Sequence, residues 1–314
     1  MKLLVTDPMP RRVVEAFNRL VPAGLTLEVV EDASEVTLAS KVADTDVILS
    51  SRAPLTSGLL DHAKKLSFIQ ILGVGTDQVD LEWARVHGVP VSHTPAANAD
   101  AVAEWTVLAL LSLTRRFIAA ERRVREGEWP FLEFVASPPP GLSSLAVGLV
   151  GLGSIGRAVA LRLSPFGPRL FYHTRHPVSE APGGAAYLPL PDLLERCDVI
   201  SLHVPLTDAT RGLIGREELS RMRQGSFLVN AARGDLVDEA ALREAIVSGH
   251  LAGAALDVLQ GEGSGGNPFR DLPQVIVTPH MAGATADSLR RMMAMALENL
   301  GLVATGREPQ HRVV

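Results

Sequence analysis

One short segment constrains the fold of this chain more than any other. An apolar run, Leu145–Val150, is typical of a buried parallel strand, and apolar residues at helical spacing follow from Ile155. Between the strand and the helix lie three glycines in the pattern G-x-G-x-x-G: Gly151, Gly153 and Gly156. This order of strand, tight turn and helix predicts a site for the pyrophosphate of a dinucleotide at the start of the helix. A glycine-rich turn in another kind of α/β domain is the alternative.

Length and composition restrict the class of protein. The chain has 314 residues, enough for about two domains, and 46% of them are hydrophobic, enough for a sizeable core. The net charge of −5 gives no indication of a nucleic-acid surface. The single cysteine, Cys197, rules out a disulfide framework, and the pair His173 and His176 has no third ligand nearby, so we expect no metal site.

The same features bear on localisation. The N-terminal residues show no signal-peptide pattern, and a single cysteine fits a reducing compartment. The longest apolar stretch, Ala101–Leu113, contains Glu104 and is too short to span a bilayer. We therefore expect a cytoplasmic protein with no membrane partner.

Strand and helix patterns alternate along both halves of the chain, which predicts α/β architecture with parallel sheets covered by helices on both faces. In the first half the expected strands are Leu3–Thr6, Leu27–Val30, Val47–Ser50, Phe68–Ile71 and Val89–Ser92. In the second half, after Leu145–Val150, they are Leu170–Tyr172, Val199–His203, Phe227–Asn230, Ala254–Val258 and Val275–Thr278. We expect two doubly wound domains, a Rossmann dinucleotide-binding domain and a flavodoxin-like substrate domain, with a cleft between them.

The two halves are joined by a segment that we expect to form one long helix, Asn98–Trp129. Its first part is apolar on all sides and must be buried, between the domains, in a subunit interface or in both. Its second part, Arg115–Glu128, is charged. The last helix, Thr285–Ala304, is expected to return to the first domain, so that residues 1–98 and 285–314 form the substrate domain and residues 99–284 form the dinucleotide domain.

The segment after the second strand of the dinucleotide domain bears on the choice of cofactor. NAD-binding domains place an acid about 20 residues after the glycines. Neither Asp nor Glu occurs between Arg157 and Ser179, and Arg175 stands there instead, flanked by Thr174 and His176. A guanidinium group can bind a 2′-phosphate through two hydrogen bonds. We therefore predict that NADP(H) is preferred over NAD(H); the alternative is a solvated surface arginine.

Three later segments place polar residues at or after the ends of expected strands. They are Val229–Asp238 with Arg233, Leu256–Glu262 with Asp257 and Glu262, and Thr278–Gly283 with His280. Such ends face the ligand in a doubly wound domain, so these groups can converge on one site. Reduction of a 2-oxo acid needs a cation for the carboxylate, a proton donor for the carbonyl oxygen and a group that tunes that donor.

Seven motifs together carry a resemblance that covers essentially the whole chain. They are GVGTDQVD at 73–80, TPAANADAVAEW at 94–105, GLGSIG at 151–156, DVISLHVPLT at 198–207, VNAARGDLVDE at 229–239, LDVLQGE at 256–262 and TPHMAG at 278–283. In this ordered set the chain resembles the D-isomer-specific 2-hydroxyacid dehydrogenases, in the branch of glyoxylate and hydroxypyruvate reductases.

The resemblance implies roles for individual residues. The catalytic set falls on Arg233, Glu262 and His280, and the amides of Val74 and Gly75 would bind the substrate carboxylate, so that the substrate would lie between the domains. Asp257 would bind the carboxamide of the cofactor. Further cofactor contacts are expected from residues of the glycine loop and of later strand ends. These are Gly151, Gly153, Ser154, Ile155, Gly156, Thr174, Arg175, His176, His203, Pro205 and Ala231.

The implied reaction is the reduction of a short 2-oxo acid, such as glyoxylate or hydroxypyruvate, by NADPH to the D-2-hydroxy acid. His280 would donate the proton, Glu262 would favour the imidazolium form of His280, and Arg233 would hold the carboxylate. Gly263 stands where the family usually has a proline, which leaves the loop after Glu262 less constrained. Without the resemblance, Glu262 would equally suit a solvated loop position.

Other functions are compatible with the same motifs. The substrate could be 3-phosphoglycerate, phosphite or another 2-hydroxy acid, although the absence of a regulatory domain after the last helix counts against the feedback-regulated phosphoglycerate type. The family also includes transcriptional corepressors, so a non-catalytic NAD(P)-sensing protein is a further alternative. We expect a homodimer that pairs through the apolar helix from Ala101, because this helix has more apolar surface than one domain junction needs.

Overall fold

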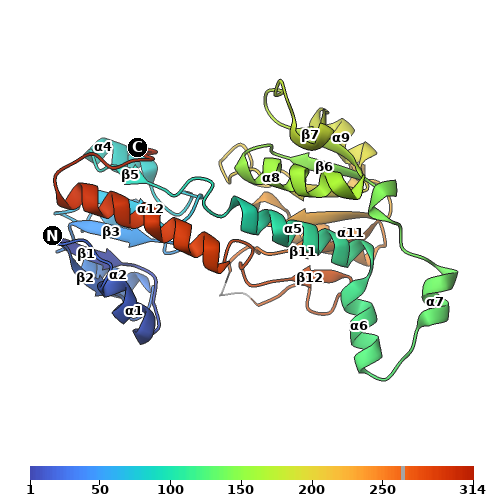
Figure 1. The fold of residues 1–314 in the computed structure, drawn as a ribbon, viewed down its shortest axis with the longest axis horizontal. Coiled ribbons are helices and arrows are strands. Elements are labelled where there is room, and N and C mark those ends of the chain that lie inside the picture. The colour runs from blue at the N-terminus through green and yellow to red at the C-terminus, as the bar shows by residue number, and fades with distance from the viewer. Residues whose placement is uncertain (263–265) are drawn as a thin grey trace. The chain divides into compact units, whose positions relative to one another are not determined.

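The computed structural model describes residues 1–262 and 266–314 and divides them into two compact units. Unit 1 contains Met1–Asn98 and Ala286–Val314, and unit 2 contains Ala99–Thr285. Each unit is built on one sheet, and the neighbouring strands described in each sheet run parallel (Figure 1). The prediction of two parallel-sheet α/β units is confirmed.

Unit 1 has a five-stranded sheet in the order β2-β1-β3-β4-β5. Its strands are β1 (Lys2–Val5), β2 (Thr26–Val29), β3 (Val47–Ser50), β4 (Phe68–Ile71) and β5 (Val91–Ser92). Its helices are α1 (Arg11–Asn18), α2 (Glu35–Val42), α3 (Ser57–Leu60), α4 (Leu81–His87) and α12 (Ala286–Ala304). The order reverses between β1 and β3, which places the loops after these strands at the edge where doubly wound sheets bind ligands.

Alternation along the unit 1 strands explains how α12 packs on this sheet. Leu3 and Val47 point to one face, where they form a cluster with Ala296 and Leu300 of α12. A polar contact fixes the helix further, because the buried Asn299 donates through Nδ2 to Gln70 Oε1 at 2.8 Å. The C-terminal helix is thus part of the core of unit 1 although it lies almost 200 residues after the rest of that unit in sequence.

Unit 2 has a seven-stranded sheet in the order β12-β11-β10-β9-β6-β7-β8. Its strands are β6 (Ala146–Val150), β7 (Arg169–His173), β8 (Ala186–Tyr187), β9 (Val199–Leu202), β10 (Ser226–Asn230), β11 (Leu251–Leu256) and β12 (Val275–Val277). Its helices are α5 (Ala99–Thr114), α6 (Phe117–Arg125), α7 (Phe131–Ala136), α8 (Ser154–Leu163), α9 (Leu190–Arg196), α10 (Arg216–Arg221) and α11 (Glu239–Val247). Short 3-10 turns lie at Leu142–Ser144, Ser164–Phe166, Pro182–Gly184 and Gly234–Leu236.

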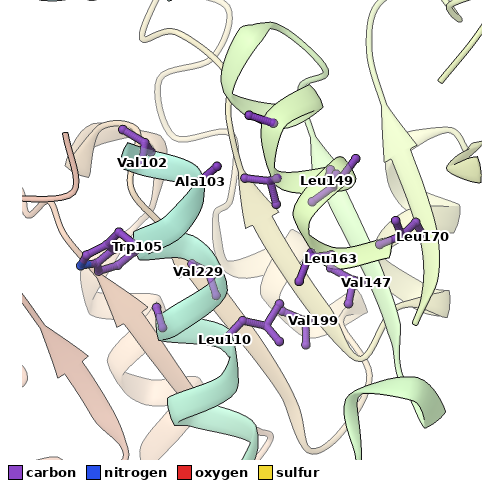
Figure 2. Packing of buried hydrophobic residues seen from close by; sticks show 14 of the residues in the cluster. Val102, Ala103, Trp105, Leu110, Val147, Leu149, Leu163, Leu170, Val199 and Val229 are labelled. Carbon is purple, nitrogen blue, oxygen red and sulfur yellow. The ribbon is translucent and has the colours of Figure 1, made fainter. Parts of the chain in front are cut away.

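The strand β6 is the centre of unit 2 because both of its faces are buried. Val147 and Leu149 point to one face, where α5 contributes Leu110 and α8 contributes Leu163 (Figure 2). Alternate residues of β6 point to the opposite face and join a second cluster that includes residues of α9 and α11. Apolar burial on both faces holds the glycine turn after β6 on a rigid strand.

The prediction of one helix over Asn98–Trp129 is wrong. The helix α5 ends at Thr114, Arg116 takes a left-handed conformation at φ 51°, and α6 begins at Phe117. Eleven residues of α5 are buried, whereas α6 and α7 bury none. The chain therefore turns away from the core where its sequence changes from apolar to charged. Figure 1 shows α6 and α7 extending away from the sheet of unit 2.

The strand β8 and the helix α7 were not expected from the sequence. The strand has only two residues, Ala186 and Tyr187, too few for a periodic pattern. The helix follows Pro130 within a segment that has no buried residue, so no apolar face marks it. Across the described ranges, no helix has both the length and the apolar character that crossing a membrane requires.

Candidate active site

Two of the three glycines after β6 are required by packing inside unit 2. Gly151 has φ 100°, and a Cβ built on it would lie 2.4 Å from the carbonyl oxygen of His203. A Cβ on Gly156 would lie 2.2 Å from the carbonyl oxygen of Gly151. Both distances are far below van der Waals contact, so side chains at these positions would push α8 and the loop after β9 away from β6.

Gly153 differs, because a Cβ built on it would meet no described atom within 4 Å apart from its immediate neighbours. Its backbone is extended, with φ −73° and ψ −161°, which any residue can adopt. No described side chain caps the helix α8 that begins after it. Open space beside an uncapped, electropositive helix start suits an approaching phosphate group, so these residues fit the pyrophosphate of a dinucleotide.

The loop after β7 presents a basic group to solvent. The buried Tyr172 holds the backbone of this loop, since its hydroxyl accepts a hydrogen bond from the Val178 amide at 3.0 Å. The Thr174 hydroxyl donates to the His176 carbonyl at 2.7 Å, so it also stabilises the loop. Arg175 and His176 are exposed, and Arg175 forms no ion pair with any residue in the described ranges.

His203 follows β9 on the other side of β6. Its ring Nε2 lies 2.9 Å from the Ser201 hydroxyl oxygen. Burial lowers the pKa of His203 to about 4, so the ring is neutral at physiological pH. Pro205 is exposed and Ala231 is half-buried. The structure therefore places His203 and Pro205 on the loop next to the glycine turn, and Ala231 directly after the neighbouring strand β10.

The turn after β10 carries Arg233. The amide of buried Asn230 donates through Nδ2 to the Arg233 carbonyl at 2.8 Å, and its Oδ1 accepts from the Ala232 amide at 3.0 Å. The half-buried Arg233 side chain donates to the Ala232 carbonyl at 2.7 Å. The role of Asn230 was not predicted from the sequence, although its place at the end of a strand that leads into Arg233 could have indicated it.

Asp257, directly after β11, fixes the segment that follows β12. Its buried carboxylate accepts hydrogen bonds from the Thr278 hydroxyl at 2.5 Å, the Met281 amide at 2.9 Å and the Ala282 amide at 2.7 Å. Its backbone carbonyl accepts from the His280 amide at 2.8 Å. These contacts give Asp257 a structural role that its motif did not reveal.

His280 is held in a left-handed conformation, with φ 53°. Non-glycine residues adopt this region at a cost of about 1–3 kcal/mol and persist there where neighbours fix them. Its Nδ1 lies 2.7 Å from Glu262 Oε2, and each side chain remains about one-third exposed, at 33% for His280 and 36% for Glu262. With Nδ1 on the carboxylate, the second ring nitrogen, Nε2, is left for exchange of a proton with a ligand.

Arg233, Glu262 and His280 follow β10, β11 and β12, which are neighbours in the sheet. The structure thus places all three at one edge of unit 2 and joins two of them by a hydrogen bond. Gly263, the departure from the family pattern next to Glu262, lies outside the described residues.

In unit 1, the turn after β4 (Phe68–Ile71) contains half-buried residues whose carbonyls and amides are used differently. The Gly73 carbonyl accepts from the Thr94 amide at 2.8 Å and from the Thr94 hydroxyl at 3.0 Å, and the Val74 carbonyl lies 2.9 Å from His93 Nδ1. Among the described residues, none accepts a hydrogen bond from the amide of Val74 or Gly75. With the carbonyls fixed, these two amides can bind an anionic group.

A family model described as D-isomer specific 2-hydroxyacid dehydrogenase, NAD binding domain, matches residues 107–282. The chain belongs to the D-isomer-specific 2-hydroxyacid dehydrogenase family. It is thus an NAD(P)-dependent enzyme of this family, as the sequence motifs predicted.

Similar proteins cover most of the chain. It is 38% identical over 279 residues to a glyoxylate reductase of Thermofilum pendens, and the aligned residues cover 87% of this chain and 82% of that protein. It is also 38% identical to a D-3-phosphoglycerate dehydrogenase of Mycobacterium tuberculosis, over 86% of this chain but 51% of that protein. The NAD-dependent formate dehydrogenase of Staphylococcus aureus in complex with NAD superposes with a TM-score of 0.91 at 30% identity, covering 100% of this chain and 99% of that one.

Metal ligation and cysteine chemistry are two further possibilities for a site in this 2-hydroxyacid dehydrogenase. The described part of the chain contains no group of three or more His, Cys, Asp or Glu side chains able to hold a metal ion. Burial raises the pKa of the Cys197 thiol to about 12, so it is not a nucleophile near neutral pH.

Substitution of Gly153, directly before α8, and of Gly156, within α8, should separate packing from ligand binding. We predict that Gly156→Ala lowers the free energy of unfolding by about 1–3 kcal/mol, because its Cβ would overlap the Gly151 carbonyl. Gly153→Ala should change it by less than about 0.5 kcal/mol yet weaken NAD(P)H binding. Urea unfolding and fluorescence titration with the nucleotide measure the two effects. Equal losses of stability would contradict the distinction.

Proposed function

We propose that this enzyme uses NADPH to reduce short 2-oxo acids, with glyoxylate and hydroxypyruvate as the substrate class, to D-2-hydroxy acids. The observation that carries the proposal is the 2.7 Å hydrogen bond between His280 Nδ1 and Glu262 Oε2 at the strand edge that also carries Arg233. The similarity to glyoxylate reductases over most of the chain supports the same substrate class.

The proposed chemistry assigns one task to each of these side chains. When bound, the reduced nicotinamide supplies the hydride for the carbonyl carbon. His280 donates a proton from Nε2 to the carbonyl oxygen as negative charge develops there, and Glu262 stabilises the imidazolium that makes this donation. Arg233 binds the substrate carboxylate through its planar guanidinium and thereby orients the carbonyl group.

The amides of Val74 and Gly75 are proposed as a second contact for the substrate carboxylate. Two fixed N–H groups bind a carboxylate without the loss of side-chain freedom that a flexible donor would incur. Both amides belong to a turn whose carbonyls are already engaged by Thr94 and His93. We therefore propose that this turn binds a small carboxylate group.

Removal of the proton donor tests the catalytic assignment. We predict that His280→Ala lowers kcat for glyoxylate and hydroxypyruvate by about 10²–10⁴-fold, because the alkoxide then has no positioned acid. Binding of NADPH, followed by fluorescence titration, should stay within about twofold of wild type, since the substitution lies outside the glycine turn. A His280→Ala rate near that of wild type would refute the assignment.

The same assay separates the alternatives. Turnover of 3-phosphohydroxypyruvate in preference to unphosphorylated 2-oxo acids would favour the phosphoglycerate dehydrogenase function of the Mycobacterium tuberculosis relative. Tight binding of NADPH without turnover of any 2-oxo acid would instead favour a cofactor-sensing protein.

The preference for NADPH is proposed from Arg175. The loop is fixed by Tyr172 and Thr174, and the exposed guanidinium lies where an acid would otherwise repel a 2′-phosphate. We predict that Arg175→Ala lowers kcat/KM for NADPH by about 10–100-fold, the value of one or two charged hydrogen bonds, and leaves kcat/KM for NADH within about twofold. Arg196→Ala, on α9, is the matched control for loss of an exposed arginine. A wild-type enzyme that prefers NADH would contradict the proposal.

We also propose a homodimer, formed through α6 and α7 rather than α5. The helix α5 is mostly buried in unit 2, whereas the α6–α7 segment exposes large apolar side chains: Phe117, Val124, Trp129, Phe131, Leu132 and Val135. Arg123 of α6 pairs with Glu133 of α7 at 2.7 Å, and also with Glu128 of the connecting segment at 2.6 Å. An ordered segment with this much exposed apolar surface is typical of a subunit interface.

Light scattering tests the oligomeric state. Wild type should have twice the chain mass of 33.5 kDa. The double variant Val124→Glu/Leu132→Glu should be monomeric, because two charges cannot be buried in an apolar interface without partners. Glu121→Gln, on the same helix, serves as the control. A monomeric wild type at micromolar concentration would contradict the proposal.

A further inference from the structure

The loop that carries Glu262 is tied to the start of α11. The Gln260 amide donates to Glu239 Oε1 at 2.6 Å, and the Gln260 side chain donates through Nε2 to the Val237 carbonyl at 3.0 Å. Both contacts lie two residues before Glu262. They fix the loop close to Glu262, whose Oε2 lies 2.7 Å from His280 Nδ1.

Gly234 packs against the same part of the loop. A Cβ built on Gly234 would lie 2.2 Å from the carbonyl carbon of Leu259 and 2.5 Å from the Gln260 nitrogen. Gly234 directly follows Arg233, so the turn with Arg233 and the loop with Glu262 are in backbone contact. The position of one proposed catalytic residue is thereby coupled to that of the other.

Glu239 is not needed to cap the helix α11. Asp238 already caps this helix, because its Oδ1 accepts from the Ala241 amide at 2.9 Å. Glu239 is half-buried, and burial raises the pKa of its carboxyl group; the hydrogen bond from the Gln260 amide opposes this effect and the charge of Asp235 adds to it. The hydrogen bond from the Gln260 amide is thus the contact that favours the charged form of Glu239.

We propose that Glu239 is a positioning residue, whose hydrogen bond to the Gln260 amide sets the place from which Glu262 reaches His280. The inference rests on the proposed function, in which Glu262 supports the protonated form of the His280 proton donor. Within the described residues, Glu239 forms no hydrogen bond with His280 or with Glu262. Its effect on the reaction is therefore exerted through the loop.

The pH profile of kcat/KM for hydroxypyruvate reduction measures this effect, with the full-length enzyme and saturating NADPH. Reduction requires the protonated donor, so kcat/KM falls as the pH rises through the midpoint of its alkaline limb. In the proposed pair Glu262 supports the protonated donor, so Glu262→Gln should lower that midpoint. Glu239→Ala should lower it in the same direction by about one pH unit, which is about tenfold in kcat/KM above the midpoint.

Conservative variants separate positioning from general damage. Glu239→Gln keeps an oxygen that accepts from the Gln260 amide, so its midpoint should match wild type. Glu239→Asp keeps the negative charge at the start of α11 but is too short to reach the amide, so it should behave like Glu239→Ala and remains informative if the alanine variant does not fold. Glu217→Ala, in the first turn of α10, is the matched control and should leave the midpoint unchanged.

The double variant Glu239→Ala/Glu262→Gln tests whether Glu239 acts on the pH profile through Glu262. Its midpoint should equal that of Glu262→Gln alone, because Glu239 acts only through Glu262. If Glu262→Gln shifts the midpoint and both Glu239→Ala and Glu239→Asp leave it at the wild-type value, or if the shifts add in the double variant, this inference is overturned and the proposed function stands. If Glu262→Gln itself causes no shift, the proposed proton-donor pair is overturned, and the inference with it.

Discussion

The buried carboxylate of Asp257 is the constraint on which the candidate site depends. It lies at the end of β11 and accepts three hydrogen bonds from the segment after β12, while its backbone carbonyl accepts one from His280. Hydrogen bonds to a buried charge contribute about 1.5–3 kcal/mol each, enough to hold His280 in a left-handed conformation that would otherwise be unfavourable.

The parallel sheet converts residues far apart in sequence into one site. The strands β10, β11 and β12 are adjacent, and each is followed by a turn that carries one of Arg233, Glu262 and His280. The glycine turn after β6 and the loop after β7 lie at the same edge of this sheet, because all its strands are parallel. The apolar faces of β6 provide the rigid base, and the polar loops carry the chemistry.

Much of this arrangement could be predicted from the sequence. Buried parallel strands appear as apolar runs, so every strand except the two-residue β8 was placed within a few residues, and the glycine pattern indicated the turn after β6. The helix over Asn98–Trp129 was misjudged because helical propensity continues across Arg116, whereas the break arises from burial, which ends there. The helical propensity of individual residues does not show where the buried core of a domain ends.

The roles of Asp257 and Glu239 could not be predicted for a related reason. Their partners are backbone amides 21 to 25 residues away, and any residue but proline supplies such an amide. A sequence motif shows which side chains are available, but the choice between binding a ligand and holding a loop depends on the tertiary fold. The 2.7 Å pair of His280 and Glu262, in contrast, joins two side chains whose chemistry the motifs had already indicated.

The central claim is that this protein transfers hydride to a 2-oxo acid and yields the D product. The most direct measurement uses hydroxypyruvate and NADPH that carries deuterium at both C4 positions, with mass spectrometry and chiral chromatography of the product. The account predicts glycerate of the D configuration with one deuterium on C2. Glycerate without deuterium on C2, glycerate of the L configuration, or no product at all would contradict it.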